Sequence, residues 1–94
     1  SNSDAGPITT GDWMGIVRGD GIVAVAPSAV GASTELLERL ITPERELLTI
    51  ITGSDARHDD LAAIEGWLSD QHADVQVEVH RGGQPLYPFL FGVE

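Results

Sequence analysis

The sequence has 94 residues, a formal net charge of −10 at pH 7 and no cysteine. A chain of this length suits one domain and buries about 60–70% of its unfolded surface, which is enough for one core. All five basic residues are arginines. This composition argues against nucleic-acid binding and against binding to an anionic membrane, because both need a basic face. We interpret the acidity as favouring solubility, with a docking surface for a basic partner as the alternative.

The sequence also shows no cysteine for covalent cross-links and no pattern of a targeting signal or a membrane-spanning helix. Without cysteine the chain forms no disulfide and no thiolate metal site. No apolar run approaches the ~20 residues of a membrane-spanning helix, and no signal-peptide pattern opens the sequence. We therefore expect a single cytoplasmic domain over residues 1–94, and interpret Ser1 and Asn2 as an expression remnant.

The first elements predicted along the chain form a β-hairpin. Residues 4–11 show no hydrophobic period and are expected to be a lead-in, in which Ile8 could add a short edge pairing. Two apolar runs, Trp13 to Val17 and Ile22 to Ala26, flank the turn sequence Arg18 to Gly21. Apolar runs around a short glycine-containing connection predict a hairpin. The Arg-Gly-Asp tripeptide at 18–20 is therefore interpreted as turn chemistry and not as an adhesion signal.

A helix is predicted next, with Ser28 as its N-cap. Helical spacing joins five side chains into one apolar stripe: Val30, Thr34, Leu37, Leu40 and Ile41. Such a stripe is expected to face the core. Thr42-Pro43 ends the helix, because a residue before proline avoids the helical region.

The middle of the chain predicts a strand, a helix and a second strand. Leu47 to Thr52 is apolar on both faces, as in a central strand. Asp55 is predicted to cap the following helix, which should end near Gln71 to Ala73. The residues predicted to form its buried face are Leu61, Ile64, Trp67 and Leu68. The strand after it spans Asp74 to His80, so the two strands should be parallel with a right-handed crossover.

The C-terminal stretch completes the predicted sheet. Val75, Val77 and Val79 alternate with polar residues, which predicts a half-buried strand. Phe89 to Val93 is apolar on both faces and is expected near the middle of the sheet. The predicted fold is α/β (α+β). It has a mixed sheet of about five strands and two main helices, in the order hairpin, helix, βαβ unit and final strand.

Between these last two strands lies a connection that we call the Arg81–Pro88 segment. It holds an arginine, a glycine pair, two prolines and a tyrosine, more than a chain reversal needs. Arginine and tyrosine are common interface anchors, and prolines reduce the entropy that a loop loses on binding. The candidate partner-binding residues are His80, Arg81, Gly82, Gly83, Gln84, Pro85, Leu86, Tyr87 and Pro88. An equally weighted alternative is a stiff connection in which Leu86 and Tyr87 pack back on the core.

No catalytic or metal site is predicted within the chain. Neither glycine-rich loop matches the phosphate-binding pattern, and the chain has no lysine to contact a nucleotide phosphate. His58, His72 and His80 are too dispersed for a local metal signature. We interpret His58-Asp59-Asp60 as a helix start. We therefore expect no enzyme activity, no ATP binding and no cofactor in this chain.

One resemblance adds to these patterns. The sequence from His80 to Pro88, continuing to Glu94, is similar to the extreme C-terminus of the bacterial dihydroxyacetone-kinase-like proteins. These serve as the ATP-binding catalytic subunit of fatty acid kinase. Looser similarity covers Gly11 to Val17 and Leu47 to Gly53, so most of the chain takes part.

The resemblance implies that the chain is a C-terminal part of a longer kinase, whose upstream domain binds ATP and Mg. It also implies that this domain helps to dock the fatty-acid-binding subunit, which presents an acyl carboxylate for phosphorylation. Two alternatives stay open, a regulatory domain that senses a small ligand and a purely structural terminal domain. The resemblance admits either a fatty acid or dihydroxyacetone as the substrate of the parent protein.

Overall fold

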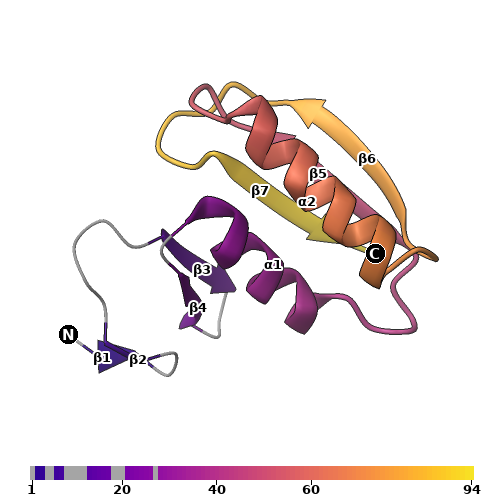
Figure 1. The fold of residues 1–94 in the computed structure, drawn as a ribbon, viewed down its shortest axis with the longest axis horizontal. Coiled ribbons are helices and arrows are strands. Elements are labelled where there is room, and N and C mark those ends of the chain that lie inside the picture. Colours follow the sequence, from indigo (N-terminus) through magenta and orange to yellow (C-terminus); the bar gives the residue numbers. More distant parts are fainter. Residues whose placement is uncertain (1, 4–5, 8–12, 18–20, 27) are drawn as a thin grey trace. The chain divides into compact units, whose positions relative to one another are not determined.

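The computed structural model describes residues 2–3, 6–7, 13–17, 21–26 and 28–94, and the side-chain environment of residues 28–94. The chain divides into two compact units, Ser1–Leu40 and Ile41–Glu94, each presented by itself below. Figure 1 labels the elements of both units. Two helices and a three-stranded mixed sheet are present, so the α+β class is confirmed.

The first unit contains two short antiparallel strand pairs and one helix. The strand β1 (Asn2–Ser3) pairs with β2 (Gly6–Pro7), a pairing that the sequence did not predict. The predicted hairpin is confirmed, since β3 (Trp13–Val17) pairs antiparallel with β4 (Gly21–Ala26). The tripeptide at 18–20, including its interpretation as a turn, lies outside the described residues.

Helix α1 (Ala29–Leu40) begins where the sequence predicts. The Oγ of Ser28 accepts a hydrogen bond of 2.9 Å from the Gly31 backbone N–H, three residues on, so Ser28 is the N-cap. The helix ends two residues before Thr42. A turn follows, in which the Arg45 N–H donates to the Thr42 carbonyl at 2.9 Å.

The buried stripe of α1 differs from the prediction by about one residue of helical rotation. The buried residues are Ala29, Ala32, Ser33, Leu36 and Leu37. Only Leu37 belongs to the predicted stripe, while Val30, Thr34 and Leu40 are half-buried. The helix lies against β3 and β4. The small side chains on the buried face let the backbones of the helix and the hairpin approach closely. This close packing determines which face is buried, so the larger apolar residues beside that face are only half-buried.

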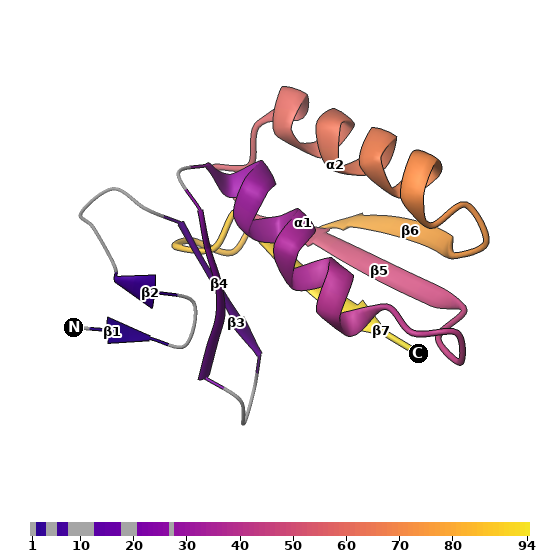
Figure 2. The ribbon, with the colours of Figure 1, turned by 60° about the horizontal axis from the view of Figure 1, so that its bottom comes forward.

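The second unit is a three-stranded sheet with one helix on its face. The strand β5 (Leu47–Thr52) lies between β6 (Gln76–Arg81) and β7 (Phe89–Val93). It pairs parallel with β6 and antiparallel with β7. Helix α2 (His58–Gln71) connects β5 to β6, which confirms the predicted βαβ unit. Figure 2 shows α2 lying over one face of this sheet.

The core of the second unit forms between α2 and β5. Leu48, Ile50 and Ile64 are fully buried, and Leu68 is 1% exposed. Leu48 and Ile50 are two apart on β5 and therefore share one face of the sheet. Of the helix face predicted from sequence, Ile64 and Leu68 are buried, whereas Leu61 and Trp67 are half-buried.

Two predictions about the sheet require correction. A single sheet of about five strands is not confirmed, because the hairpin forms its own two-stranded sheet among the described residues. The final strand β7 is at an edge and not near the middle. Its apolar composition reflects one buried residue, Phe89, and an outward-facing Leu90 that is 42% exposed. The central strand is β5, so β6 is the other edge strand of this sheet. Its Val79 is 40% exposed.

The start of α2 also differs from the prediction. Arg57, not Asp55, is the N-cap residue, and it makes no side-chain capping bond. The Ala56 N–H instead donates to the Gly53 carbonyl at 3.2 Å. This bond closes a tight turn after β5 and places Asp55 outside the helix.

Candidate functional site

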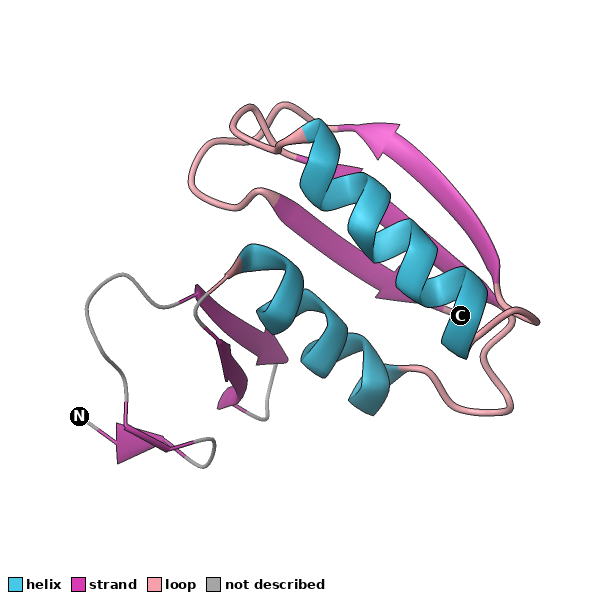
Figure 3. Cartoon of the chain, in the orientation of Figure 1, coloured by secondary structure: helices cyan, strands magenta, loops and turns pink. Residues whose placement is uncertain are grey.

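The Arg81–Pro88 segment is held against the end of β5 and the loop that follows it. Figure 3 shows it as part of the connection between β6 and β7. The backbone N–H groups of Gly82 and Gly83 both donate to the Thr52 carbonyl, at 2.9 and 3.0 Å. Further along, the Gly53 N–H donates to the Pro88 carbonyl at 2.8 Å. The segment is thus fixed at both ends by backbone bonds.

Gln84 fixes the middle of the segment. Its side-chain Nε2 donates to the Ile51 carbonyl at 3.2 Å and to the Tyr87 carbonyl at 3.1 Å. Its own backbone carbonyl accepts from the Ser54 N–H at 2.9 Å. The half-buried Gln84 therefore connects β5, the loop that follows β5, and Tyr87 within the Arg81–Pro88 segment.

Glycines are required where these two loops meet. A Cβ on Gly53 would overlap the backbone carbonyls of Gln84 and Tyr87. A Cβ on Gly82 would overlap the Ile51 side chain and that of Gln84. The first glycine of the pair is therefore a packing requirement, in addition to a turn signal.

Beyond these anchors, the segment exposes two large side chains. Leu86 is 82% exposed and Tyr87 is 55% exposed. Leu86 has φ +77, and the Tyr87 N–H donates to the Pro85 carbonyl at 2.9 Å, so the three residues form a γ-turn of the strained, positive-φ kind. For a non-glycine residue this conformation costs about 1–3 kcal/mol. The exposure contradicts the interpretation in which Leu86 and Tyr87 pack on the core.

The residues at the start of the predicted site lie apart from this turn. His80 is exposed, and its Nε2 lies 3.4 Å from the Glu78 Oε1. Arg81 ends β6 and makes no side-chain hydrogen bond or ion pair with another described residue. The predicted site residues thus fall into three parts. The first is the stretch from Gly82 to Gln84, which hydrogen bonds hold in place; the second is the exposed Leu86–Tyr87 turn; the third is the end of β6, which carries His80 and Arg81.

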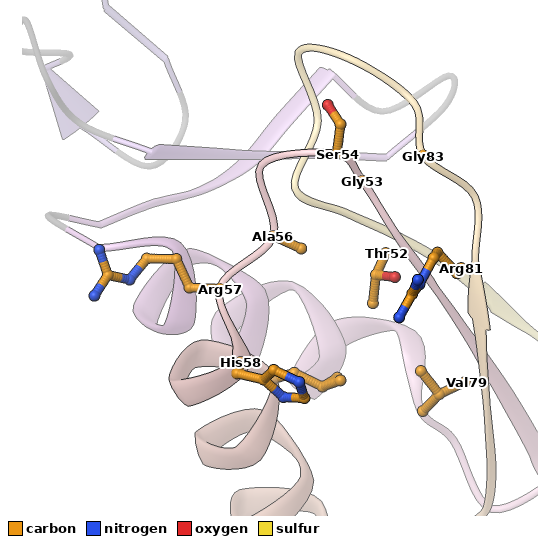
Figure 4. A pocket seen from close by; sticks show the side chains of 10 residues that line it. Thr52, Gly53, Ser54, Ala56, Arg57, His58, Val79, Arg81 and Gly83 are labelled. Atoms are coloured by element: carbon orange, nitrogen blue, oxygen red, sulfur yellow. The ribbon is translucent and has the colours of Figure 1, made fainter.

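Sequence reasoning missed a cavity next to the charged strand end. The cavity has a volume of about 490 Å³ and is partly open to solvent. It is lined by Thr52, Gly53, Ser54, Ala56, Arg57, His58, Leu61, Val79, Arg81 and Gly83. We call it the strand-end cavity, because it lies where the parallel strands β5 and β6 end and α2 begins. Figure 4 shows these side chains. Its signal in the sequence is faint, because its residues are spread over three elements.

Within the part of the chain that the structure describes, no group of three or more histidine, aspartate or glutamate side chains is placed to hold a metal ion. No described helix has both the length and the hydropathy needed to cross a membrane.

Comparison with known proteins places the chain in a family. Three uncharacterized proteins from the Staphylococcus aureus strains USA300, NCTC 8325 and COL are each 39% identical over 82 residues. The match covers 87% of this chain and 15% of each relative, so the chain spans a small part of the length of these proteins. A family model for the C-terminal domain of FakA-like fatty acid kinase proteins matches residues 1–94. The chain belongs to this family of C-terminal domains.

Proposed function

We propose that the chain is a non-catalytic interaction domain that docks the fatty-acid-binding partner of a fatty acid kinase. In this proposal the upstream part of the parent protein phosphorylates the acyl carboxylate that the partner presents. The observation that carries the proposal is the exposed Leu86–Tyr87 turn on a segment whose backbone is fixed. Family membership supports the assignment to a fatty acid kinase.

The geometry of the turn suits partner binding. Gln84 and the backbone bonds to Gly53 and Thr52 fix the loop before any partner arrives. A fixed loop loses less conformational entropy on binding. Leu86 is 82% exposed, yet the chain holds it in a strained conformation. Strain of this kind clusters at binding and catalytic sites, which makes a partner contact the best account of it.

The catalytic machinery belongs to the upstream domain in this proposal. ATP and Mg are expected to bind there, because this chain lacks lysine and a phosphate-binding loop. We propose a cytoplasmic kinase as the parent protein. Calorimetry of this chain with Mg-ATP tests whether nucleotide binding belongs to the upstream domain. Saturable heat with micromolar affinity would contradict that assignment.

A pull-down with the fatty-acid-binding subunit tests the docking role. We expect Leu86→Gly and Tyr87→Ala to reduce capture about tenfold or more, because truncation of an interface anchor costs about 1–4 kcal/mol. Leu86→Gly removes the side chain and also relieves the positive φ, so its melting temperature should not fall. Leu90→Ala is the matched control, since Leu90 is an exposed leucine on β7 outside the turn.

Two outcomes would separate the alternatives. Capture that is unchanged in both variants would place the docking surface elsewhere. A fall in melting temperature for Tyr87→Ala as large as for a core truncation would make the segment structural.

A ligand-sensing regulatory role is the second candidate, and the strand-end cavity is the observation that favours it. The cavity is not an apolar pocket between helix and sheet, because the buried side chains of Leu48, Ile50 and Ile64 occupy that space. It lies instead at the strand ends, with polar and charged lining residues.

A further inference from the structure

The strand-end cavity collects positive charge in an acidic chain. The chain has 15 aspartate and glutamate residues and five arginines. Two of the arginines, Arg57 and Arg81, line the cavity together with His58, whereas no carboxylate of the described residues lines it. Neither arginine side chain makes a hydrogen bond or ion pair with another of the residues described. Among the described residues, the side-chain donors of Arg81 are therefore unused and face the cavity.

The side chains approach the cavity from different elements. Figure 4 shows Arg81, from the end of β6, and His58, from the start of α2, extending toward the same space. Arg57 extends away from it, so this arginine contributes charge at the rim. Thr52 and Leu61 add a hydroxyl and an apolar side chain to the lining. A ligand with a charged end and a small apolar part fits this lining.

The position in the fold favours the same chemistry. Ligands of α/β sheets bind outside the carboxyl ends of parallel strands, which is where β5 and β6 end here. The first turn of α2 lies beside the cavity, and Arg57 provides no side-chain cap for its amides. Asp59 and Asp60 lie in that turn but do not line the cavity. Uncapped amides and the helix dipole add to the attraction that the arginines exert on an anion.

We propose that the strand-end cavity binds the oxyanion group, phosphate or carboxylate, of a small ligand. Arg81 is the main charge partner, and His58 is the second side chain that faces the anion. A volume of about 490 Å³ admits a small organic molecule, since ligand pockets range from about 300 to 1,000 Å³. This site is separate from the Leu86–Tyr87 turn and does not rest on the docking role.

Nuclear magnetic resonance titration of the chain with inorganic phosphate or acetate, at constant ionic strength set by chloride, tests the site. We expect saturable shifts of the backbone amide signals of Gly53, Ser54, His58 and Gly83. Arg81→Gln should weaken phosphate binding about tenfold or more, because it removes a charge-assisted hydrogen bond. Arg39→Gln is the matched control, since it makes the same change of net charge at an exposed position of α1.

Each result decides the proposal. Tighter binding of phosphate than of acetate supports a phosphorylated ligand, and the reverse supports a carboxylate ligand. Absence of saturation, shifts spread over the whole surface, or equal weakening by Arg39→Gln and Arg81→Gln would overturn the proposal. The amide spectrum of Arg81→Gln itself verifies that this variant is folded, and failure of phosphate binding leaves the pull-down test of docking unaffected.

Discussion

The most informative perturbation is the removal of the Gln84 side chain. Its Nε2 makes two hydrogen bonds, to the carbonyls of Ile51 and Tyr87. A hydrogen bond contributes a net 0.5–1.5 kcal/mol, so Gln84→Ala should lower the free energy of unfolding by about 1–3 kcal/mol. For a domain of this size that loss lowers the melting temperature by about 4–8 °C per kcal/mol.

Two further variants sharpen this test. Gln84→Glu keeps the shape of the side chain but at neutral pH has no N–H to donate, so a carboxylate would face two carbonyl oxygens. We expect it to melt no higher than Gln84→Ala. Gln71→Ala is the control, because Gln71 is an exposed glutamine at the end of α2, and its melting temperature should match that of the unmodified chain.

Thermal unfolding followed by circular dichroism measures these differences, and the pull-down adds a second readout. Gln84→Ala should also reduce capture of the fatty-acid-binding subunit, because the Leu86–Tyr87 turn would no longer be fixed before binding. A melting temperature for Gln84→Ala within about 1 °C of that of Gln71→Ala would refute the reasoning. The two bonds together would then contribute less than about 1 kcal/mol, which is the lowest net value expected for two hydrogen bonds.

Gly53→Ala should destabilise the fold by about 1–3 kcal/mol or more, because its Cβ would meet backbone carbonyls. Gly66→Ala, at an open position of α2, should stabilise the fold by about 0.5–1 kcal/mol, and equal melting temperatures of the two variants would contradict this. Leu37→Ala should cost about 2–5 kcal/mol in urea unfolding, since Leu37 is fully buried, and a loss below about 1 kcal/mol would contradict its core position. The pKa of Glu44 is held below its ordinary value of 4.5, chiefly by a hydrogen bond from the Thr42 side chain, so Thr42→Val should raise it in an NMR titration. Because that pKa is lowered, the stabilising contribution of Glu44 is present above about pH 4.5 and is lost as the pH falls through the folded-state pKa; an unshifted titration would show that Thr42 is not the cause.

Several features followed from local sequence alone. Ser28 before a helical stretch predicted the N-cap, because a hydroxyl placed there satisfies an amide three residues on. The apolar run Leu47–Thr52 predicted the central strand, and the spacing to the next strand predicted their parallel pairing. The composition of the Arg81–Pro88 segment also marked it as unusual before its geometry was known. Local patterns sufficed because each of these features depends on neighbouring residues or on one period.

Tertiary structure decided which apolar residues are buried and which strands are central. Phe89 and Leu90 are both strongly apolar in sequence, yet one is buried and the other is 42% exposed, because consecutive strand residues point to opposite faces and Phe89 shares the face of the buried Leu48 and Ile50. On α1 the buried face includes Ala32 and Leu36, because packing against the hairpin determines which side of the helix is covered.

The same holds for the candidate sites. The roles of Gln84 and Gly53 depend on contacts across about 30 residues of sequence, between loops that only the sheet brings together. Arg57 and Arg81 are isolated cations in the sequence and line one cavity only because β5 and β6 run parallel and end at the same edge. Residue type determined what each side chain can do, whereas strand pairing determined which side chains act together, because pairing depends on long-range packing that no local period encodes.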